Sequence, residues 1–158
     1  QCVIYDSPNK DAKLIGVEYI ITKRLYDTLP DDEKKLWHSH HYEVTSGSLF
    51  MPFLSAVPQA VGDRVEHQEM VHLVNTYGKT WHLWQVDRGD QLPIGPAQLM
   101  MSFTEELPVP QQMVKKIERD FGVDIEKKME NRKDIKHNAP DPNTNAWLSR
   151  KSFQVKLK

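Results

Sequence analysis

The run Leu14-Ile15-Gly16-Val17-Glu18-Tyr19-Ile20-Ile21-Thr22 is the clearest secondary-structure signal in this chain. β-Branched and aromatic residues dominate it, and such residues favour the extended backbone of a strand. A shorter run of the same kind, Cys2-Val3-Ile4-Tyr5, precedes it. The residues between the two runs, Asp6-Ser7-Pro8-Asn9-Lys10-Asp11, are turn formers. The two runs therefore predict a β-hairpin at the start of the sequence.

Helical patterns follow further along the chain. Pro30 precedes three acidic residues, which is typical of a helix start because acidic side chains stabilise the positive end of the helix dipole. Residues 65–77 carry apolar side chains at the spacing of one helical face, with Gly78 as the C-cap. The apolar residues with this spacing are Met70, Leu73, Val74 and Tyr77. We expect helices at both places.

The second half of the sequence predicts two more helices. Residues 110–121 are amphipathic, with Met113, Ile117 and Phe121 aligned and Gly122 behind them. Residues 124–136 are expected to form a further exposed helix. Strand candidates are residues 48–54, 80–86 and 98–103, which are rich in apolar and aromatic side chains.

Strands followed by helices, with short connections and no internal repeat, predict a single α+β domain. We expect an antiparallel or mixed sheet with helices packed on one side. The domain is expected to span residues 1–137. Residues 138–158 are expected to form an irregular tail packed on it, with Trp147 and Phe153 as anchors.

The bulk properties exclude several classes of protein. The chain has 158 residues, enough for a domain with a core, and a formal net charge of −1. This charge gives no general attraction to nucleic acid or to an anionic membrane. The single cysteine excludes an internal disulfide and suits the cytoplasm, and no apolar run approaches the roughly 20 residues that span a bilayer. Because the chain opens on a strand without Met, we expect that natural N-terminal sequence is missing.

The most chemically suggestive segment is Lys35-Leu36-Trp37-His38-Ser39-His40-His41-Tyr42-Glu43-Val44. If it is extended, His38 and His40 point to the same side, and a His-x-His pair can offer two imidazole nitrogens to one divalent transition metal, zinc or iron. His82, in an aromatic-rich strand, is a third candidate ligand if the two strands pair. Glu43, placed with His41 on the opposite face unless the chain turns, is the candidate catalytic acid–base.

Each of these residues also has a plainer interpretation. The histidines can belong to a half-buried strand edge with local hydrogen bonds, and aromatic strands such as Trp81–Gln85 are usually core. The segment resembles the first half of a cupin metal motif only loosely, because Glu43 comes too early in it. The second half of that motif, which contains the remaining His, is not found in the sequence. His67 and His72 lie about 140° apart on a helix and cannot share an ion. Glu69 and His72 have the spacing of carboxylate-bridged metal sites, but in one copy only.

The Arg88-Gly89-Asp90 tripeptide is better explained by a buried Asp/Arg network that pins its loop than by adhesion. No catalytic triad or phosphate loop is present in the sequence.

Several segments of the chain resemble the oil body-associated protein family, long catalogued as a domain of unknown function. The similarity covers nearly the whole chain and weakens after about residue 108. The segments that carry it are Gln1-Cys2-Val3-Ile4-Tyr5-Asp6, Leu14 to Ile21, Glu33-Lys34-Lys35-Leu36-Trp37-His38-Ser39-His40, Tyr77-Gly78-Lys79-Thr80-Trp81 and Trp84-Gln85-Val86-Asp87-Arg88-Gly89-Asp90.

The resemblance implies a soluble protein associated with lipid droplets, where family members affect droplet size and number. It supplies no established catalytic residues. Family chains carry a further His-rich segment before the first strand, which fits the expected missing N-terminus. Docking to the droplet surface or to droplet proteins would use an amphipathic face, since no long hydrophobic hairpin is present. We expect that face among Trp147, Phe153 and the Met113/Ile117/Phe121 stripe.

Two other functions stay open at this point. The first is a metal-dependent enzyme acting on a small molecule through His38, His40 and His82, with Glu43 as acid–base. The second is an interaction module whose histidines form a pH-sensitive surface. A homo-oligomer is compatible with all three functions.

Overall fold

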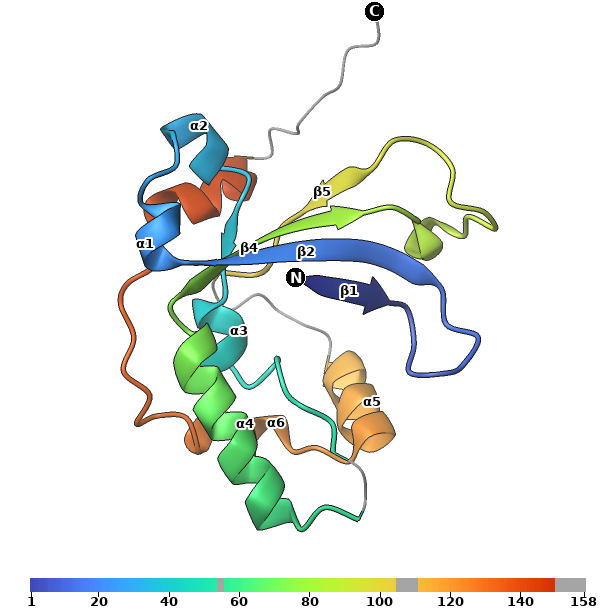
Figure 1. The fold of residues 1–158 in the computed structure, drawn as a ribbon. Coiled ribbons are helices and arrows are strands. Elements are labelled where there is room, and N and C mark those ends of the chain that lie inside the picture. Colours follow the sequence, from blue (N-terminus) through green and yellow to red (C-terminus); the bar gives the residue numbers. More distant parts are fainter. Residues whose placement is uncertain (54–55, 105–110, 150–158) are drawn as a thin grey trace, which may run out of the picture. The chain divides into compact units, whose positions relative to one another are not determined.

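The computed structural model describes residues 1–53, 56–104 and 111–149, and its order of strands and helices confirms the predicted α+β class (Figure 1). Contacts divide the chain into two compact units, each built from separated segments. The first unit comprises residues 1–38, 77–102 and the segment from 141 onward, and the second comprises residues 39–76 and 103–140. The expected boundary at residue 137 stays a prediction.

The predicted hairpin is confirmed in the first unit, where β1 (Cys2–Tyr5) pairs antiparallel with β2 (Leu14–Thr22). In this register Cys2 lies opposite Glu18 and Val3 lies opposite Val17. The Asp6 carboxylate accepts a 2.8 Å hydrogen bond from the Lys13 backbone N–H and so closes the turn.

The remaining strands are shorter or shifted relative to the predictions. The described sheet has five strands in the order β1-β2-β4-β3, with β5 paired to β4. β3 is His38–Ser39, β4 is Thr76–His82, and β5 is Gln98–Met100, antiparallel to β4 (Figure 1). The strand expected at 80–86 therefore begins earlier and ends at His82. Beyond it the chain folds into a 3₁₀ turn, η1 (Val86–Arg88), which ends at Gly89 with a φ of 87°.

The core of the first unit is aromatic. Tyr26, Trp37 and Tyr77 are buried together, and the rings of Tyr26 and Tyr77 stack with centroids 3.7 Å apart. Two short helices lie in this unit: α1 (Lys23–Tyr26) brings in Tyr26, and α2 (Asp31–Lys34) begins directly after Pro30, as predicted. Burial raises the pKa of the Tyr26 hydroxyl, which therefore stays protonated at physiological pH.

The tail of the first unit contains more regular structure than predicted. Residues expected to be irregular include a 3₁₀ helix, η2 (Pro142–Ser149), which packs beside α2. Thr144 of η2 is fully buried and Trp147 is half-buried. Phe153, the other expected anchor, lies outside the described residues.

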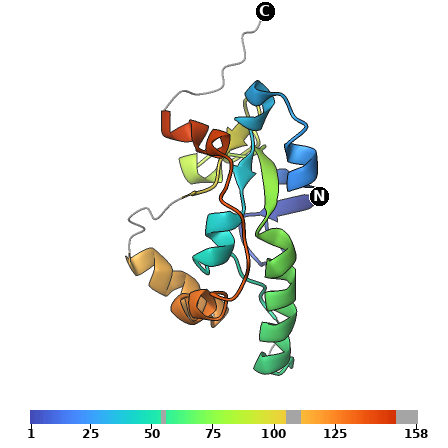
Figure 2. The same cartoon turned by 90° about the vertical axis from the view of Figure 1, so that its left-hand side faces the viewer.

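The second unit contains four helices among its described residues: α3 (His41–Thr45), α4 (Gln59–Leu73), α5 (Gln111–Phe121) and α6 (Ile125–Glu130). Figure 2 shows α5 and α6 as two successive orange helices. The link between them begins at Gly122, whose φ is 63°. The α5 prediction is confirmed almost residue for residue.

Three predictions for the second unit are wrong. The helix expected at 65–77 is α4, which starts after Pro58 and ends at Leu73. The Thr76 hydroxyl donates to the Leu73 carbonyl (2.7 Å), and Gly78 lies inside β4 instead of capping the helix. Residues 48–53 form no strand, and α6 ends at Glu130, well short of residue 136.

The second unit is held by an apolar cluster and a buried ion network. Val44, Met70, Val74 and Ile135 form the cluster. Beside it, Glu66 accepts hydrogen bonds from Arg132 Nη2 (2.6 Å), Lys128 Nζ (3.0 Å) and the Met51 backbone N–H (3.0 Å). Arg132 Nη1 also donates to the Val44 carbonyl at 2.7 Å. The network therefore ties α3, α4 and α6 together.

Among the residues that the structure describes, no helix has the length and apolar character that crossing a membrane requires.

Candidate functional site

The histidine segment is extended over only two residues. β3 ends at Ser39, His40 adopts a helical backbone (φ −77°, ψ −1°), and α3 begins at His41. The expectation that His41 and Glu43 share a strand face is therefore wrong, because two residues along a helix differ by about 160° in direction. The turn is local: the His40 backbone N–H donates to the Thr76 carbonyl, and the His40 carbonyl accepts from the Val44 N–H.

His38 lies beside a carboxylate that the sequence did not connect to it. Its side chain is buried, and its Nε2 lies 3.0 Å from Glu18 Oε1 of β2. Glu18 is itself largely buried. This pair is an ion pair when the imidazole is protonated and a hydrogen bond to a neutral imidazole otherwise. No sequence motif links the two residues, because positions 18 and 38 come together only through the sheet.

Gly78 of β4 provides the space for this pair. A Cβ added at Gly78 would lie 2.1 Å from Glu18 Oε1 and 2.6 Å from His38 Nε2. Both distances are far below van der Waals contact, so any side chain here would push the carboxylate and the imidazole away. The role of Gly78 is thus to admit the polar pair.

His40 is buried, and its hydrogen bonds fix its tautomer. The imidazole Nδ1 lies 2.8 Å from Thr76 Oγ1, and that hydroxyl already donates its hydrogen to the Leu73 carbonyl. Nδ1 must therefore carry the hydrogen, which leaves the lone pair of the neutral ring on Nε2. A hydrogen bond that fixes the second ring nitrogen is the usual support of a metal-binding histidine.

Among the described residues, Glu18, His38 and His40 form a group in which one ligand atom of each lies within 4.8 Å of the others. Two imidazoles and a carboxylate are a donor set that zinc and non-haem iron accept. The structure thus brings together two of the three predicted ligands and adds Glu18.

The third predicted ligand, His82, lies at the far end of β4. It lies four positions after Gly78, which corresponds to about 13 Å along an extended strand. The His82 ring packs against Gly16, whose added Cβ would lie 3.2 Å from its Cδ2. Burial lowers the pKa of His82, and the charge of Asp87 partly opposes the shift.

The predicted acid–base residue, Glu43, lies in α3 of the second unit. Its backbone carbonyl accepts hydrogen bonds from the Leu49 N–H (3.1 Å) and the Ser48 hydroxyl (3.3 Å). These hydrogen bonds to the Glu43 backbone stabilise the turn at Gly47.

The other polar motifs have local partners. His67 Nε2 lies 2.9 Å from Asp134 Oδ1, and this contact lowers the pKa of the Asp134 carboxyl. Arg88 pairs with the carboxylate of Asp90, as expected for a pinned loop, although Arg88 itself is exposed. The Trp84 indole N–H also donates to the Asp90 carbonyl at 2.9 Å and helps to close the loop.

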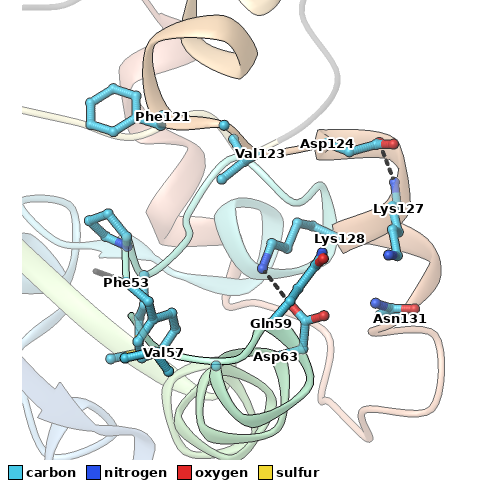
Figure 3. Close-up of a pocket in the computed structure, with 14 residues that line it drawn as sticks. Phe53, Val57, Gln59, Asp63, Phe121, Val123, Asp124, Lys127, Lys128 and Asn131 are labelled. Carbon is cyan, nitrogen blue, oxygen red and sulfur yellow. Dashed lines mark hydrogen bonds and ion pairs between the residues drawn. The ribbon is translucent and has the colours of Figure 1, made fainter. Parts of the chain in front are cut away.

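The second unit contains a pocket that no sequence motif indicated (Figure 3). Its volume is about 560 Å³, and its walls come from residues within 51–53, 57–63 and 121–131. Phe53, Val57, Phe121 and Val123 gather toward one end, whereas Lys127 and Asn131 lie at the other. The only sequence signal for it was the apolar stripe of α5, whose last member, Phe121, reaches the wall.

Comparison with known proteins gives close relatives and no solved structure that matches. Oil body-associated protein 1A from Zea mays is 48% identical over 132 residues, which cover 84% of this chain and 52% of that protein. Oil body-associated protein 2C from Arabidopsis thaliana is 53% identical over 102 residues, covering 65% of this chain and 40% of the relative.

Oil body-associated protein 2A from Zea mays is 39% identical over 160 residues, which cover 98% of this chain and 61% of the relative. The chain spans about half the length of the curated relatives it matches. The resemblance to oil body-associated proteins that the sequence suggested is confirmed by these matches. Because the family model described as protein of unknown function (DUF1264) also matches residues 1–136, the chain belongs to that family.

Proposed function

We propose that this protein associates with the surface of lipid droplets from the cytoplasmic side. The observation that carries the proposal is the name shared by relatives that are 39–53% identical over most of the chain, all of them called oil body-associated proteins. A protein of this kind needs an exposed apolar surface that can enter the droplet boundary.

The α5 helix supplies such a surface. Met113 is 57% exposed and Phe121 is 41% exposed, and Ile117 lies between them on the same face. Lys115 lies about 160° around the helix from Ile117, on the polar side. A short helix with an apolar stripe and lysines opposite is suited to lie in the plane of a lipid surface.

Flotation with artificial droplets tests the proposal. Droplets of triacylglycerol coated with phospholipid are centrifuged with the purified protein at low and at moderate salt, and the floated fraction is measured. Met113→Gln should lower the partition coefficient about tenfold, since a lost apolar side chain is worth roughly 1.5 kcal/mol.

The matched control is Leu92→Gln. Leu92 is 65% exposed in a loop of the first unit, so the substitution removes similar apolar area at another place. It should leave flotation unchanged. A wild-type protein that stays in solution at both salt concentrations would refute direct docking, and equal losses in the two variants would refute the role of α5.

A second candidate function rests on the Glu18/His38/His40 group. We propose that His38 and His40 hold a divalent transition metal, zinc or iron, with Glu18 in place of the expected His82 as the third ligand. Bound there, the metal would polarise a small-molecule substrate as a Lewis acid or activate oxygen. Glu43 remains the proposed acid–base residue of such an enzyme. Droplet association and metal binding are compatible with each other.

Elemental analysis by inductively coupled plasma mass spectrometry tests the metal. One equivalent of a transition metal is expected in tag-free protein, and it should be lost in His38→Ala/His40→Ala. His67→Ala is the control, because His67 contacts Asp134 on the surface and belongs to no metal group. Metal content that is zero in the wild type, or unchanged in the double variant, would refute this function.

A further inference from the structure

We propose that the pocket of the second unit binds a single-chain amphiphile with a monoanionic carboxylate head group, of the fatty-acid type. The proposal is independent of droplet association, because it rests on the shape and charge of the pocket alone. Three observations carry it: an apolar end, a lysine whose ammonium group is not engaged, and two carboxylates that set a limit on the charge of the ligand.

The pocket is large enough for a small molecule, and packed aromatic side chains form the walls of its apolar end. A volume of about 560 Å³ lies within the range of roughly 300–1,000 Å³ that is usual for small-molecule sites. The Phe121 ring packs edge-to-face on Phe50 with centroids 5.4 Å apart, which fixes that wall. On the opposite wall, the Phe53 ring lies over Gly62 of α4. A Cβ added at Gly62 would be 2.9 Å from Phe53 Cδ2. The absence of a side chain at Gly62 therefore lets the Phe53 ring pack against the helix, outside the pocket space.

Among the described residues that line the polar end, Lys127 is the one cation without an ion pair. Lys128 is neutralised, because its ammonium contacts Asp63 (3.1 Å) and Glu66 (3.0 Å). The Asp124 carboxylate caps α6 by accepting the Lys127 backbone N–H at 2.8 Å. Within the described part of the chain, no hydrogen bond or ion pair is formed by the Lys127 ammonium group. Asn131 lies four residues on, on the same side of the helix, and adds an amide donor beside it.

The charge of the lining favours a monoanion. Asp63 and Asp124 both line the pocket with Lys127 and Lys128, so the formal charge of these four residues is zero. A single carboxylate can accept hydrogen bonds from Lys127 and Asn131. A dianionic phosphate would meet the same two donors and a stronger repulsion from the aspartates. A cationic head group would compete with Lys127 for the same space.

The experiment compares three probes that share one tail. Dodecanoate, dodecyl phosphate and dodecyltrimethylammonium are titrated into the full chain by isothermal calorimetry, each below the concentration at which it forms micelles. Saturable binding of one dodecanoate per chain is expected, with weaker binding of the other two. Absence of saturable dodecanoate binding would overturn the proposal, and so would equal or tighter binding of either other probe.

Three variants locate the binding. Lys127→Gln should weaken dodecanoate binding about tenfold, the usual effect of losing a hydrogen bond to a charged group. Gly62→Ala should weaken it by displacing Phe53 into the pocket, while alanine favours the helix, so the fold is preserved. Lys133→Gln is the control, because Lys133 is exposed and does not line the pocket. Unchanged binding in both Lys127→Gln and Gly62→Ala, or an equal loss in Lys133→Gln, would place the ligand elsewhere.

Discussion

Each unit of this protein buries a carboxylate beside nitrogen donors, but the donors differ in kind. In the second unit Glu66 contacts Arg132 and Lys128, whose charges are permanent under physiological conditions. In the first unit Glu18 contacts His38, and an imidazole is also a common ligand of transition metals. The arrangement around Glu66 can only hold structure together, whereas the arrangement around Glu18 can also bind a metal ion. The comparison separates a structural buried ion pair from a candidate site.

The largest effect is expected in the second unit. Arg132→Met removes the partner of Glu66 and the donor to the Val44 carbonyl, and leaves a buried carboxylate with Lys128 alone. We expect the free energy of unfolding to fall by about 3 kcal/mol or more, as is usual when one partner of a buried ion pair is removed. Denaturant unfolding measures it. Arg119→Met, at an exposed position, is the control, and an equal small loss in both variants would contradict a structural role for the network.

Metal should stabilise only the arrangement of the first unit, in which Glu18 contacts His38. At a free zinc concentration 100 times the dissociation constant, binding raises the free energy of unfolding by about 2.7 kcal/mol. We expect a corresponding rise in the Tm of the wild type, reversed by a chelator and absent in His38→Ala/His40→Ala. Zinc that raises the Tm of the double variant as much as that of the wild type would show binding at another place.

Two glycine substitutions, one in each unit, provide a further test. Gly78→Ala places a methyl group on Glu18 and His38, and we expect a loss of about 1–3 kcal/mol, as for overpacking in a core. Gly62→Ala displaces only the half-exposed Phe53 ring and gains helix propensity, so its unfolding free energy should change by less than about 0.5 kcal/mol. Chemical denaturation of both variants tests this. Equal losses of unfolding free energy in the two variants would mean that a methyl group is tolerated no better at Gly62 than at Gly78.

The smallest effect concerns pH. His41 Nε2 lies 2.9 Å from His137 Nδ1 in the second unit, and burial, with the charge of His137, lowers the pKa of His41. The pKa of His82 in the first unit is lowered as well, by burial. For a base whose pKa is lower in the folded state, stability is complete above the unfolded value near 6.5 and is lost as pH falls below it.

Unfolding at pH 7.5 and pH 5.5 measures this loss, and His41→Gln and His82→Gln should each reduce it. Carboxylates titrate mainly below this window and contribute little. A pH dependence that is identical in the wild type and both variants would contradict the assignment. If both variants reduce it, the two units share the pH dependence of stability, His41 in the second and His82 in the first.

Local patterns predicted the elements that depend on neighbouring residues. The β1–β2 hairpin follows from two β-branched runs and a polar turn, and α5 follows from an apolar stripe closed by Gly122. The wrong secondary-structure predictions arose where contacts between segments far apart in sequence override the local pattern. Tyr77 fits the helical spacing of α4 and Gly78 fits its C-cap, yet both are in β4, because Tyr77 stacks on Tyr26 and Gly78 makes room for Glu18 and His38. Residues 48–53 are apolar but form no strand, and Met51 instead donates its backbone N–H to Glu66.

The sequence by itself determined the α+β class, the first hairpin, the amphipathic α5 helix and the family, since each depends on residue types and spacings along the chain. It also singled out His38 and His40. Only the tertiary structure placed Glu18 against His38, turned His41 and Glu43 into a helix, and assembled the pocket around Phe53, Phe121 and Lys127. The physical reason is that a ligand group or a cavity depends on distances between segments far apart in sequence. Those distances are set by sheet register and core packing, which no short motif encodes.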